Sequence, residues 1–156
     1  MTKLTSILAV AVIAASAVAA SVSAQTAPSR EPIMYGANTG EYTPTGIALR
    51  GDAEILQGQN RLRAEAVEVT LTNGAITRIE ASGGVYYVTP EQTLRGDRAT
   101  YAVSTGVVTV TGDVILTQGQ NVLTGSTATY DVDSRTARLS GGSSGRVEGV
   151  FYPEQN

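Results

Sequence analysis

One repeated stretch decides the fold of this 156-residue chain. Residues 83–111 read GGVYYVTPEQTLRGDRATYAVSTGVVTVT, and residues 112–140 follow as GDVILTQGQNVLTGSTATYDVDSRTARLS. Aligned without a gap, eight positions are identical, where ordinary residue frequencies give about two. The identical pairs are Gly83/Gly112, Val85/Val114, Leu94/Leu123, Gly96/Gly125, Ala99/Ala128, Thr100/Thr129, Tyr101/Tyr130 and Val103/Val132. The chain is therefore built from repeats of about 29 residues.

An earlier copy precedes these two. Gly51-Asp52 recurs as Gly112-Asp113, and the Gln-Gly-Gln-Asn sequence of residues 57–60 recurs at residues 118–121. The first copy carries about three additional residues around Asn73-Gly74 and before the second copy begins. Three full units, with a partial unit at either end, account for the domain.

Within a unit, side chains alternate with the period of two that is typical of strands. Val108 and Val110, for example, alternate with Thr109 and Thr111. Turn-forming sequences recur between such stretches, which predicts short strands and leaves no room for a helix. These sequences are Thr89-Pro90-Glu91, Gly96-Asp97, Ser104-Thr105-Gly106 and Gly112-Asp113, together with the two Gln-Gly-Gln-Asn sequences, where Gly58 and Gly119 permit positive φ.

The positions that stay apolar from copy to copy predict one continuous inner face. They are Ala53/Val85/Val114, Ile55/Tyr87/Leu116, Leu62/Leu94/Leu123, Val67/Ala99/Ala128, Val69/Tyr101/Tyr130, Leu71/Val103/Val132 and Ile79/Val110/Leu139. Such ladders make an elongated all-β structure in which neighbouring units bury each other's apolar face. Periodicity alone does not separate an antiparallel trough from a parallel β-helix.

The composition excludes several kinds of chemistry. The chain has no Cys and no His, which excludes disulfides, zinc fingers, cysteine nucleophiles and Ser-His-Asp triads. Its net charge of −3 gives no basic footprint for nucleic acid. We therefore expect no enzymatic activity, no metal, no cofactor and no nucleic-acid partner.

Two acidic patterns are better explained as ordinary surface features. Asp131-Val132-Asp133-Ser134 lacks the oxygen-rich loop and closing Glu of an EF-hand, which favours a turn between strands over a calcium site. Two carboxylate pairs could suggest a glycosidase, namely Glu65 with Glu68 and Asp97 with Asp113. The chain has no Trp for the sugar-binding subsite expected beside such carboxylates, which favours ordinary surface acids.

Residues 1–24 are expected to be a cleaved signal peptide. Lys3 precedes an apolar run over residues 7–20, and Val22-Ser23-Ala24 offers small residues to a signal peptidase, which leaves Gln25 as the mature N-terminus. The competing interpretation is a membrane anchor, which the short, Ala-rich run disfavours. The mature chain carries ten Arg, no Lys and 14 acidic residues, so every cation in it is an arginine.

The repeat resembles that of the OstA-like domain family, and most closely its periplasmic lipopolysaccharide transport members. The resemblance rests on Gly-Asp-Arg-Ala-Thr-Tyr at residues 96–101, Val-Thr-Gly-Asp-Val-Ile-Leu-Thr-Gln-Gly at 110–119, Leu-Thr-Gly at 123–125 and Ala-Thr-Tyr-Asp at 128–131. It covers roughly residues 46–142, and residues 146–153 resemble the last strand and terminal proline of the family. The resemblance implies a β-jellyroll opened into a V-shaped trough of two antiparallel sheets.

The resemblance also implies a function. The chain is expected to bind lipopolysaccharide through lipid A and to form part of a periplasmic bridge between the inner and outer membranes. Its partners would be the homologous domains of the inner- and outer-membrane components and further copies of itself, joined end to end. The inner-trough residues expected to contact lipid are Ile55, Leu62, Val69, Val85, Tyr87, Leu94, Tyr101, Val103, Val114, Leu116, Leu123, Tyr130 and Val132.

The expected organisation is a signal peptide over residues 1–24, an N-terminal segment with the first strands over 25–45, an OstA-like domain over 46–153 and a tail over 154–156. The segment between Pro28 and Pro44 is too irregular for its strands to be assigned. The stretch from Val147 to Tyr152 carries only one charge and is expected to be a poorly protected edge strand.

Two other functions stay open, the second of them within the family that the chain resembles. One is an extracytoplasmic structural or adhesin-like β-repeat domain, which predicts a closed core and no lipid cargo. The other is the inner-membrane partner of the same pathway, which shares the fold and would keep residues 1–24 as an anchor.

Overall fold

The protein is described here from a computed structural model, which describes residues 31–142 and 145–153. These residues form one antiparallel sheet of ten strands, and they contain no helix. The expected signal peptide lies outside the described residues. The strands are β1 (Ile33–Gly36), β2 (Thr39–Thr43), β3 (Gly46–Gln57), β4 (Asn60–Thr72), β5 (Ala75–Val88), β6 (Thr93–Ala102), β7 (Val107–Gln118), β8 (Asn121–Asp131), β9 (Thr136–Ser140) and β10 (Glu148–Val150).

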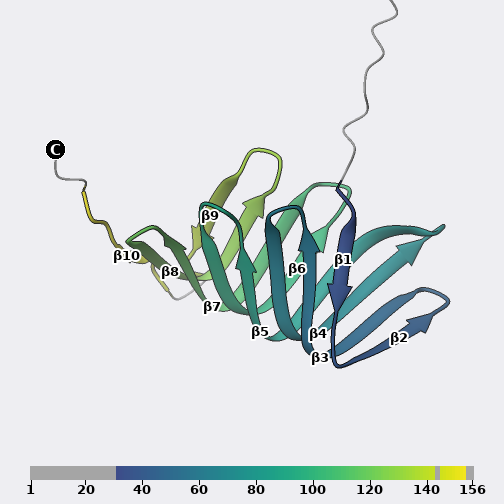
Figure 1. Ribbon diagram of the computed structural model, residues 1–156. Helices are drawn as coiled ribbons and strands as arrows, with labels where there is room; N and C mark the ends of the chain where they lie inside the picture. Colours follow the sequence, from purple (N-terminus) through teal and green to yellow (C-terminus); the bar gives the residue numbers. More distant parts are fainter. Residues whose placement is uncertain (1–30, 143–144, 154–156) are drawn as a thin grey trace, which may run out of the picture. The chain divides into compact units, whose positions relative to one another are not determined.

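The sheet is an up-and-down meander. From β3 to β8, each strand pairs with the next strand in the chain, and Figure 1 follows this order from blue to yellow. Each 29-residue repeat is thus one complete strand with half of the strand on either side of it. The antiparallel pairing identifies the trough and excludes the parallel β-helix that periodicity left open.

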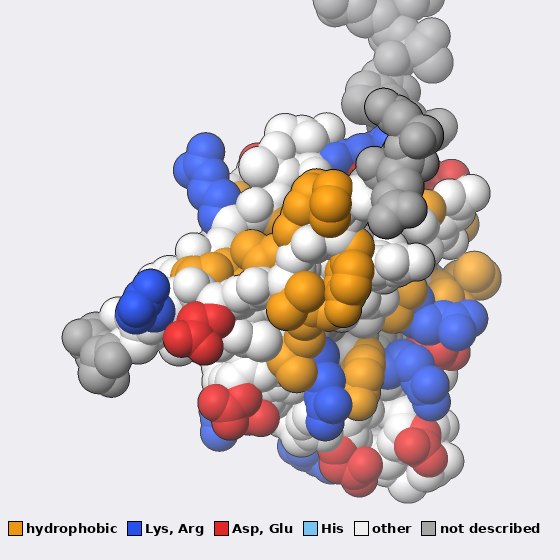
Figure 2. All heavy atoms as spheres, turned by 90° about the vertical axis from the view of Figure 1, so that its left-hand side faces the viewer, with side chains coloured by type: hydrophobic (Ala, Val, Ile, Leu, Met, Phe, Trp, Pro, Cys, Tyr) orange, Lys and Arg blue, Asp and Glu red, His pale blue; other side chains and the backbone are white. Residues whose placement is uncertain are grey.

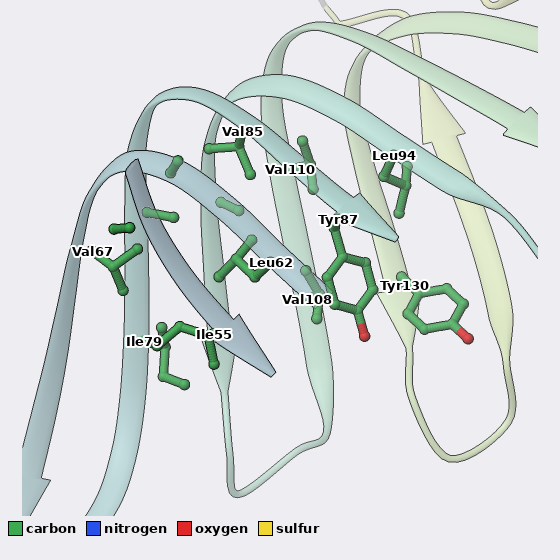
Figure 3. Packing of buried hydrophobic residues seen from close by; sticks show 14 of the residues in the cluster. Ile55, Leu62, Val67, Ile79, Val85, Tyr87, Leu94, Val108, Val110 and Tyr130 are labelled. Carbon is green, nitrogen blue, oxygen red and sulfur yellow. The ribbon is translucent and has the colours of Figure 1, made fainter. Parts of the chain in front are cut away.

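A bulge in the middle of the long strands creases the sheet. The pairing register skips two residues at corresponding places in β3, β4, β5, β6 and β7, and the strands arch over at this line (Figure 3). The skipped residues include Gly51-Asp52, Gly83-Gly84, Gly96-Asp97 and Gly112-Asp113. We call this line the crease.

The crease corrects one prediction from the sequence. Gly96-Asp97 and Gly112-Asp113 were expected to be turns between short strands, but each lies inside a strand that continues through it. Gly112 has a φ of 82°, and Asp113 has a φ of 44°. At Gly112-Asp113 the bulge uses the same left-handed backbone as many turns, whereas at Gly96 a Cβ would collide with the Val110 side chain on β7. Glycine therefore suits a bulge at these positions as well as it suits a turn. The predicted strands are therefore halves of longer, creased strands.

The crease divides the sheet into two arms. The first arm ends at the turns of residues 58–59, 89–92 and 119–120 and carries β1 and β10 at its edges. The second arm ends at residues 73–74, 103–106 and 132–135 and carries β2 and β9. Together β1 and β2 follow the path of one long strand, and β9 and β10 do the same at the other end. These arms correspond to the two sheets of the predicted V-shaped trough, which the structure confirms.

The core lies between the arms, with its most buried residues beside the crease. Val85 and Val114 on the first arm and Val67 and Val110 on the second are fully buried, as is Leu94. Figure 3 shows Val67, Val85, Leu94 and Val110 pointing into the space that the arching strands enclose. The apex of the V is thus a close-packed core, which joins the two arms along the crease.

Two turn predictions are confirmed. Gly58 and Gly119 both have a φ of 59° in the two-residue turns of the Gln-Gly-Gln-Asn sequences. At the β8–β9 turn, the Asp131 carboxylate accepts hydrogen bonds from the backbone N–H groups of Ser134 (2.8 Å) and Asp133 (3.0 Å). These bonds, led by the one from Ser134, hold the pKa of Asp131 below its ordinary value. Their stabilising effect is present while Asp131 is ionised, and it is lost as the pH falls through that lowered pKa.

Candidate functional site

The candidate site is the apolar face between the two arms, which we call the trough. Towards the open side of the V the packing leaves a cavity. Its walls come from both arms and are almost entirely apolar. The lining residues are Ile33, Ile55, Leu62 and Tyr87 from the first arm, Ile79, Ala99, Tyr101, Val108 and Val132 from the second, and the polar Gln57 and Asn60 at the rim.

Most of the predicted trough residues lie on this inner face. Nine of them are buried, namely Ile55, Leu62, Val69, Val85, Tyr87, Leu94, Val114, Leu116 and Tyr130. Tyr101, Val103 and Val132 are partly exposed. Five of the thirteen predicted residues line the cavity, namely Ile55, Leu62, Tyr87, Tyr101 and Val132. The face was predicted as one surface, but it has a packed floor at the crease and a cavity nearer the opening.

Leu123 departs from its repeat equivalents. It is 37% exposed, whereas Leu62 and Leu94 are buried. The outer neighbour of β8 in this arm is the three-residue strand β10, and the residue opposite Leu123 is Gly149, which has no side chain to cover it. The repeat pattern could not show this, because burial in the last unit depends on β10, a strand outside the repeats.

Two tyrosines meet across the trough. The rings of Tyr87 on the first arm and Tyr130 on the second have centroids 5.6 Å apart at an interplanar angle of 56°. Figure 3 shows the two rings side by side with both hydroxyls pointing the same way. Burial, followed by the proximity of Tyr130 and Tyr101, raises the pKa of the Tyr87 hydroxyl. The Tyr87 phenol therefore stays neutral, and both rings present large, polarisable surfaces to the trough.

An ion pair spans the open side of the trough. Arg135 Nη1, in the turn at the end of the second arm, lies 3.3 Å from Glu91 Oε1, in a turn at the end of the first. Both side chains are largely exposed, so this pair contributes at most about 1 kcal/mol. The arms are held together mainly by the apolar contacts beneath it, and the pair is readily broken.

The cavity between the arms is small in this state. Its volume is about 40 Å³, enough for a few water molecules. An extended hydrocarbon chain does not fit unless the walls move apart. The structure thus describes a nearly closed trough, a point on which the sequence carried no information.

The sequence reasoning missed some of the lining residues. Val108 lines the cavity, and its alternation with Thr109 already placed it on the inner face. Ile33 lines the cavity from β1, in the N-terminal segment whose strands could not be assigned. Pairing with β3, rather than any local signal, orders β1.

The acidic pairs form no catalytic constellation among the described residues. Glu65 and Glu68 lie on exposed positions of β4, and Glu68 forms an exposed ion pair with Arg50 at 3.1 Å. Asp97 and Asp113 lie at the crease on neighbouring strands. The described residues contain no group of three or more acidic, His or Cys side chains that could hold a metal ion. They also contain no helix long and apolar enough to cross a membrane.

A creased antiparallel sheet with apolar inner walls and polar strand ends defines a trough-forming class of protein. Comparison with known families places the chain within that class. Residues 37–136 match the family described as LptA/(LptD N-terminal domain) LPS transport protein, and the chain belongs to this family. The members of the family are transport proteins and not enzymes, in agreement with the expectation from the sequence.

A solved structure shows the same fold. It is the crystal structure of LptH from Pseudomonas aeruginosa, described as the LptA homologous periplasmic component of the conserved lipopolysaccharide transport device. The identity is 21%, the TM-score is 0.70, and the match covers 79% of this chain and 96% of LptH. A search of curated proteins finds no match.

Proposed function

We propose that this protein is a periplasmic carrier that holds the acyl chains of lipopolysaccharide in its trough and forms part of a bridge between the two membranes. The observation that carries the proposal is the apolar cavity between the arms of a member of a lipopolysaccharide transport family. The cavity combines apolar walls with a polar rim at Gln57 and Asn60, as an amphiphile requires.

The energetics explain why a carrier needs such walls. Each CH₂ group exposed to water costs about 0.8 kcal/mol, so the several acyl chains of lipid A amount to tens of kcal/mol. A cavity of about 40 Å³ cannot shield them, so loading requires the arms to separate. The contact between Tyr87 and Tyr130 would then be replaced by contacts with lipid, and the exposed Glu91–Arg135 pair would offer little resistance.

Photo-crosslinking tests the trough assignment. We expect a photoreactive amino acid at Tyr87, Tyr101 or Leu116 to capture lipopolysaccharide in cells, because these side chains face the interior between the arms. The same group at Asp97, on the exposed side of the crease, is the control and should capture little. Immunoblotting of the crosslinked products for lipopolysaccharide provides the measurement.

Equal labelling inside and outside would show that the trough is not the binding site. No labelling anywhere, together with no displacement of a fluorescent lipopolysaccharide from the purified protein, would favour the alternative of a structural or adhesin-like domain with a closed core. The structural or adhesin-like alternative predicts a trough that stays closed in the presence of lipid.

The periplasmic location has its own test. We expect mass spectrometry of the osmotic-shock fraction to find the protein with an N-terminus at or within a few residues of Gln25, because the small residues before it suit a signal peptidase. An intact Met1 terminus in the membrane pellet would instead identify an anchored inner-membrane partner.

The proposed bridge requires end-to-end contact, and the edges of the sheet are suited to it. One end of the sheet presents β1 and β2, and the other presents β10 and β9, in the first and second arms respectively. Their directions are such that β10 of one copy would lie antiparallel to β1 of the next, and β9 antiparallel to β2. Both arms would therefore continue without a break across the joint.

Exposed apolar side chains gather at these same edges. Met34, Tyr35 and Tyr42 lie on β1 and β2, and Val147, Val150, Phe151 and Tyr152 lie on or beside β10. Figure 2 shows hydrophobic side chains collected over the end of the folded unit that carries β8, β9 and β10. Homologous domains with the same edges are the other partners that this surface fits.

A further inference from the structure

The outer face of the first arm carries a row of arginine and tyrosine side chains away from the trough. Arg63 on β4, Tyr86 on β5 and Arg95 on β6 lie directly opposite one another in the pairing register. The Arg95 guanidinium lies over the Tyr86 ring, 5.3 Å from its centroid. Arg61 lies two residues before Arg63, on the same face of β4. Three arginines are thus gathered around one exposed aromatic ring.

This row borders an open hollow of about 450 Å³. Its walls are Arg61, Arg63, Tyr86, Leu56 and Val88, and the turn residues Gly58 and Gln59 close it at the end of the arm. Such a concave surface offers apolar walls, an aromatic face and two guanidinium groups together, with Arg95 beside it over the Tyr86 ring. Arginines that served only to keep the surface soluble would not need to lie beside an aromatic ring and a hollow.

Only one of the three arginines has an acidic partner. Arg61 Nε lies 3.0 Å from Glu54 Oε1, while Arg63 and Arg95 form no ion pair within the described part of the chain. Arg63 and Tyr86 also line an adjoining hollow on the side of the crease, together with Asp52 and Glu65, and Glu54 lies opposite Arg63 in the pairing register. Arg63 and Arg95, which flank Tyr86 from the two neighbouring strands, are therefore the arginines of the row without an ion pair in the described residues.

The hollow and the trough share one hairpin. The β3–β4 hairpin places Ile55, Gln57 and Leu62 on the cavity side and Leu56 and Arg61 on the outer side, since successive residues of a strand face opposite ways. The β3–β4 hairpin lies between the two, and its turn is the end of the arm. A molecule with hydrocarbon chains in the trough could therefore reach the outer hollow with its polar head by passing over residues 57–60.

We propose that this hollow binds a phosphorylated sugar. Arginine binds phosphate through paired N–H donors, and tyrosine presents an aromatic face against which a sugar ring can pack. The two unpaired arginines, Arg63 and Arg95, lie two strand spacings apart, about 9.6 Å. A phosphate bound near Tyr86 would lie between them and could accept hydrogen bonds from either one. Resting on the proposed function, we assign this ligand to the phosphorylated headgroup of the lipid in the trough. A separate phosphorylated glycan has the same chemistry.

Binding measurements with a matched pair of variants test the assignment. The test variant is Arg63→Gln with Arg95→Gln. The control is Arg98→Gln with Arg138→Gln, which removes the same charge from exposed positions on the second arm. Each purified protein is titrated with three probes, namely intact lipopolysaccharide, the same lipopolysaccharide with its phosphates removed, and its deacylated phosphorylated oligosaccharide. Circular dichroism confirms that both variants fold.

We expect the test variant to bind intact lipopolysaccharide about five- to tenfold more weakly, and the dephosphorylated form as well as the wild type does. The control should differ from the wild type by less than about twofold for every probe. If the wild type binds the deacylated oligosaccharide and the test variant does not, the phosphate site is confirmed and also accepts a separate glycan.

Other outcomes overturn the assignment. An equal loss for intact and dephosphorylated lipopolysaccharide would show that the row does not recognise phosphate. An equal loss of affinity in the control variant would show that the effect comes from the change in net charge alone. If the wild type bound intact and dephosphorylated lipopolysaccharide with equal affinity, the headgroup site would be refuted, and the carrier function would still be supported. Binding of the oligosaccharide alone, with no lipid bound, would refute the carrier function and keep the site.

Discussion

Leu94→Ala is expected to lower the free energy of unfolding by about 3 kcal/mol. Leu94 is fully buried on β6, between Tyr87 on β5 and Leu116 on β7. Its truncation leaves a cavity in the close-packed floor of the trough, where the creased strands can relax only slightly. For a folded unit of this size, the loss corresponds to a fall in melting temperature of about 10 °C, measurable by thermal or urea denaturation.

The repeat supplies its own control for this prediction. Leu123 occupies the same position one unit later but is 37% exposed. Leu123→Ala should therefore cost less than about 1 kcal/mol, although the sequence pattern treats the two leucines as equivalent. If both substitutions destabilised the protein equally, Leu123 would have to be buried in solution by another molecule that covers this end of the sheet.

Val150→Pro is expected to abolish concentration-dependent self-association. Val150 lies on β10, the outermost strand of the first arm, and is 54% exposed. Proline has no N–H to donate and does not fit within a continuing ladder, so the edge could not accept β1 of another copy. Sedimentation velocity over a range of concentrations measures the effect, and complementation in cells reports its consequence for transport.

Val150→Thr serves as the matched control, because it keeps the N–H group and the β-branched shape at the same position. It should associate nearly as the wild type does. Far-ultraviolet circular dichroism should show both variants folded, since β10 pairs with only three residues of β8. Association of the proline variant at wild-type strength would exclude pairing through this strand.

The sequence predicted the fold because its signal is repeated. An alternation that appears once is ambiguous, whereas apolar residues kept in register at Ile55, Tyr87 and Leu116 mark an inner face that the structure buries at every copy. The all-β class, the continuous inner face and the turns at Gly58 and Gly119 followed from such positions. The family resemblance supplied what the alternation could not, namely that the sheet is antiparallel.

Other features depend on contacts that the local sequence does not encode. The Gly-Asp pairs of the crease predicted turns, because Gly-Asp serves a bulge as well as a turn. The strands β1 and β2 follow no repeat and are positioned by pairing with β3. The row formed by Arg63, Tyr86 and Arg95 spans three strands, so it becomes visible only once the pairing register is known.

The meander also gives the trough an adjustable length. Each hairpin carries its own bulge, its own share of the floor and its own turns, and no strand is threaded between two others along the path from β3 to β8. Removing the 29 residues from Gly83 to Thr111 would join Ser82 to Gly112, and the new strand would keep its crease and its register with β4 and β8. The walls would be the same in cross-section and shorter by two strand widths, about 10 Å. Duplication of a hairpin would lengthen them by the same step, so a scaffold of this kind can match the size of its cargo in whole hairpins without redesign of its interior.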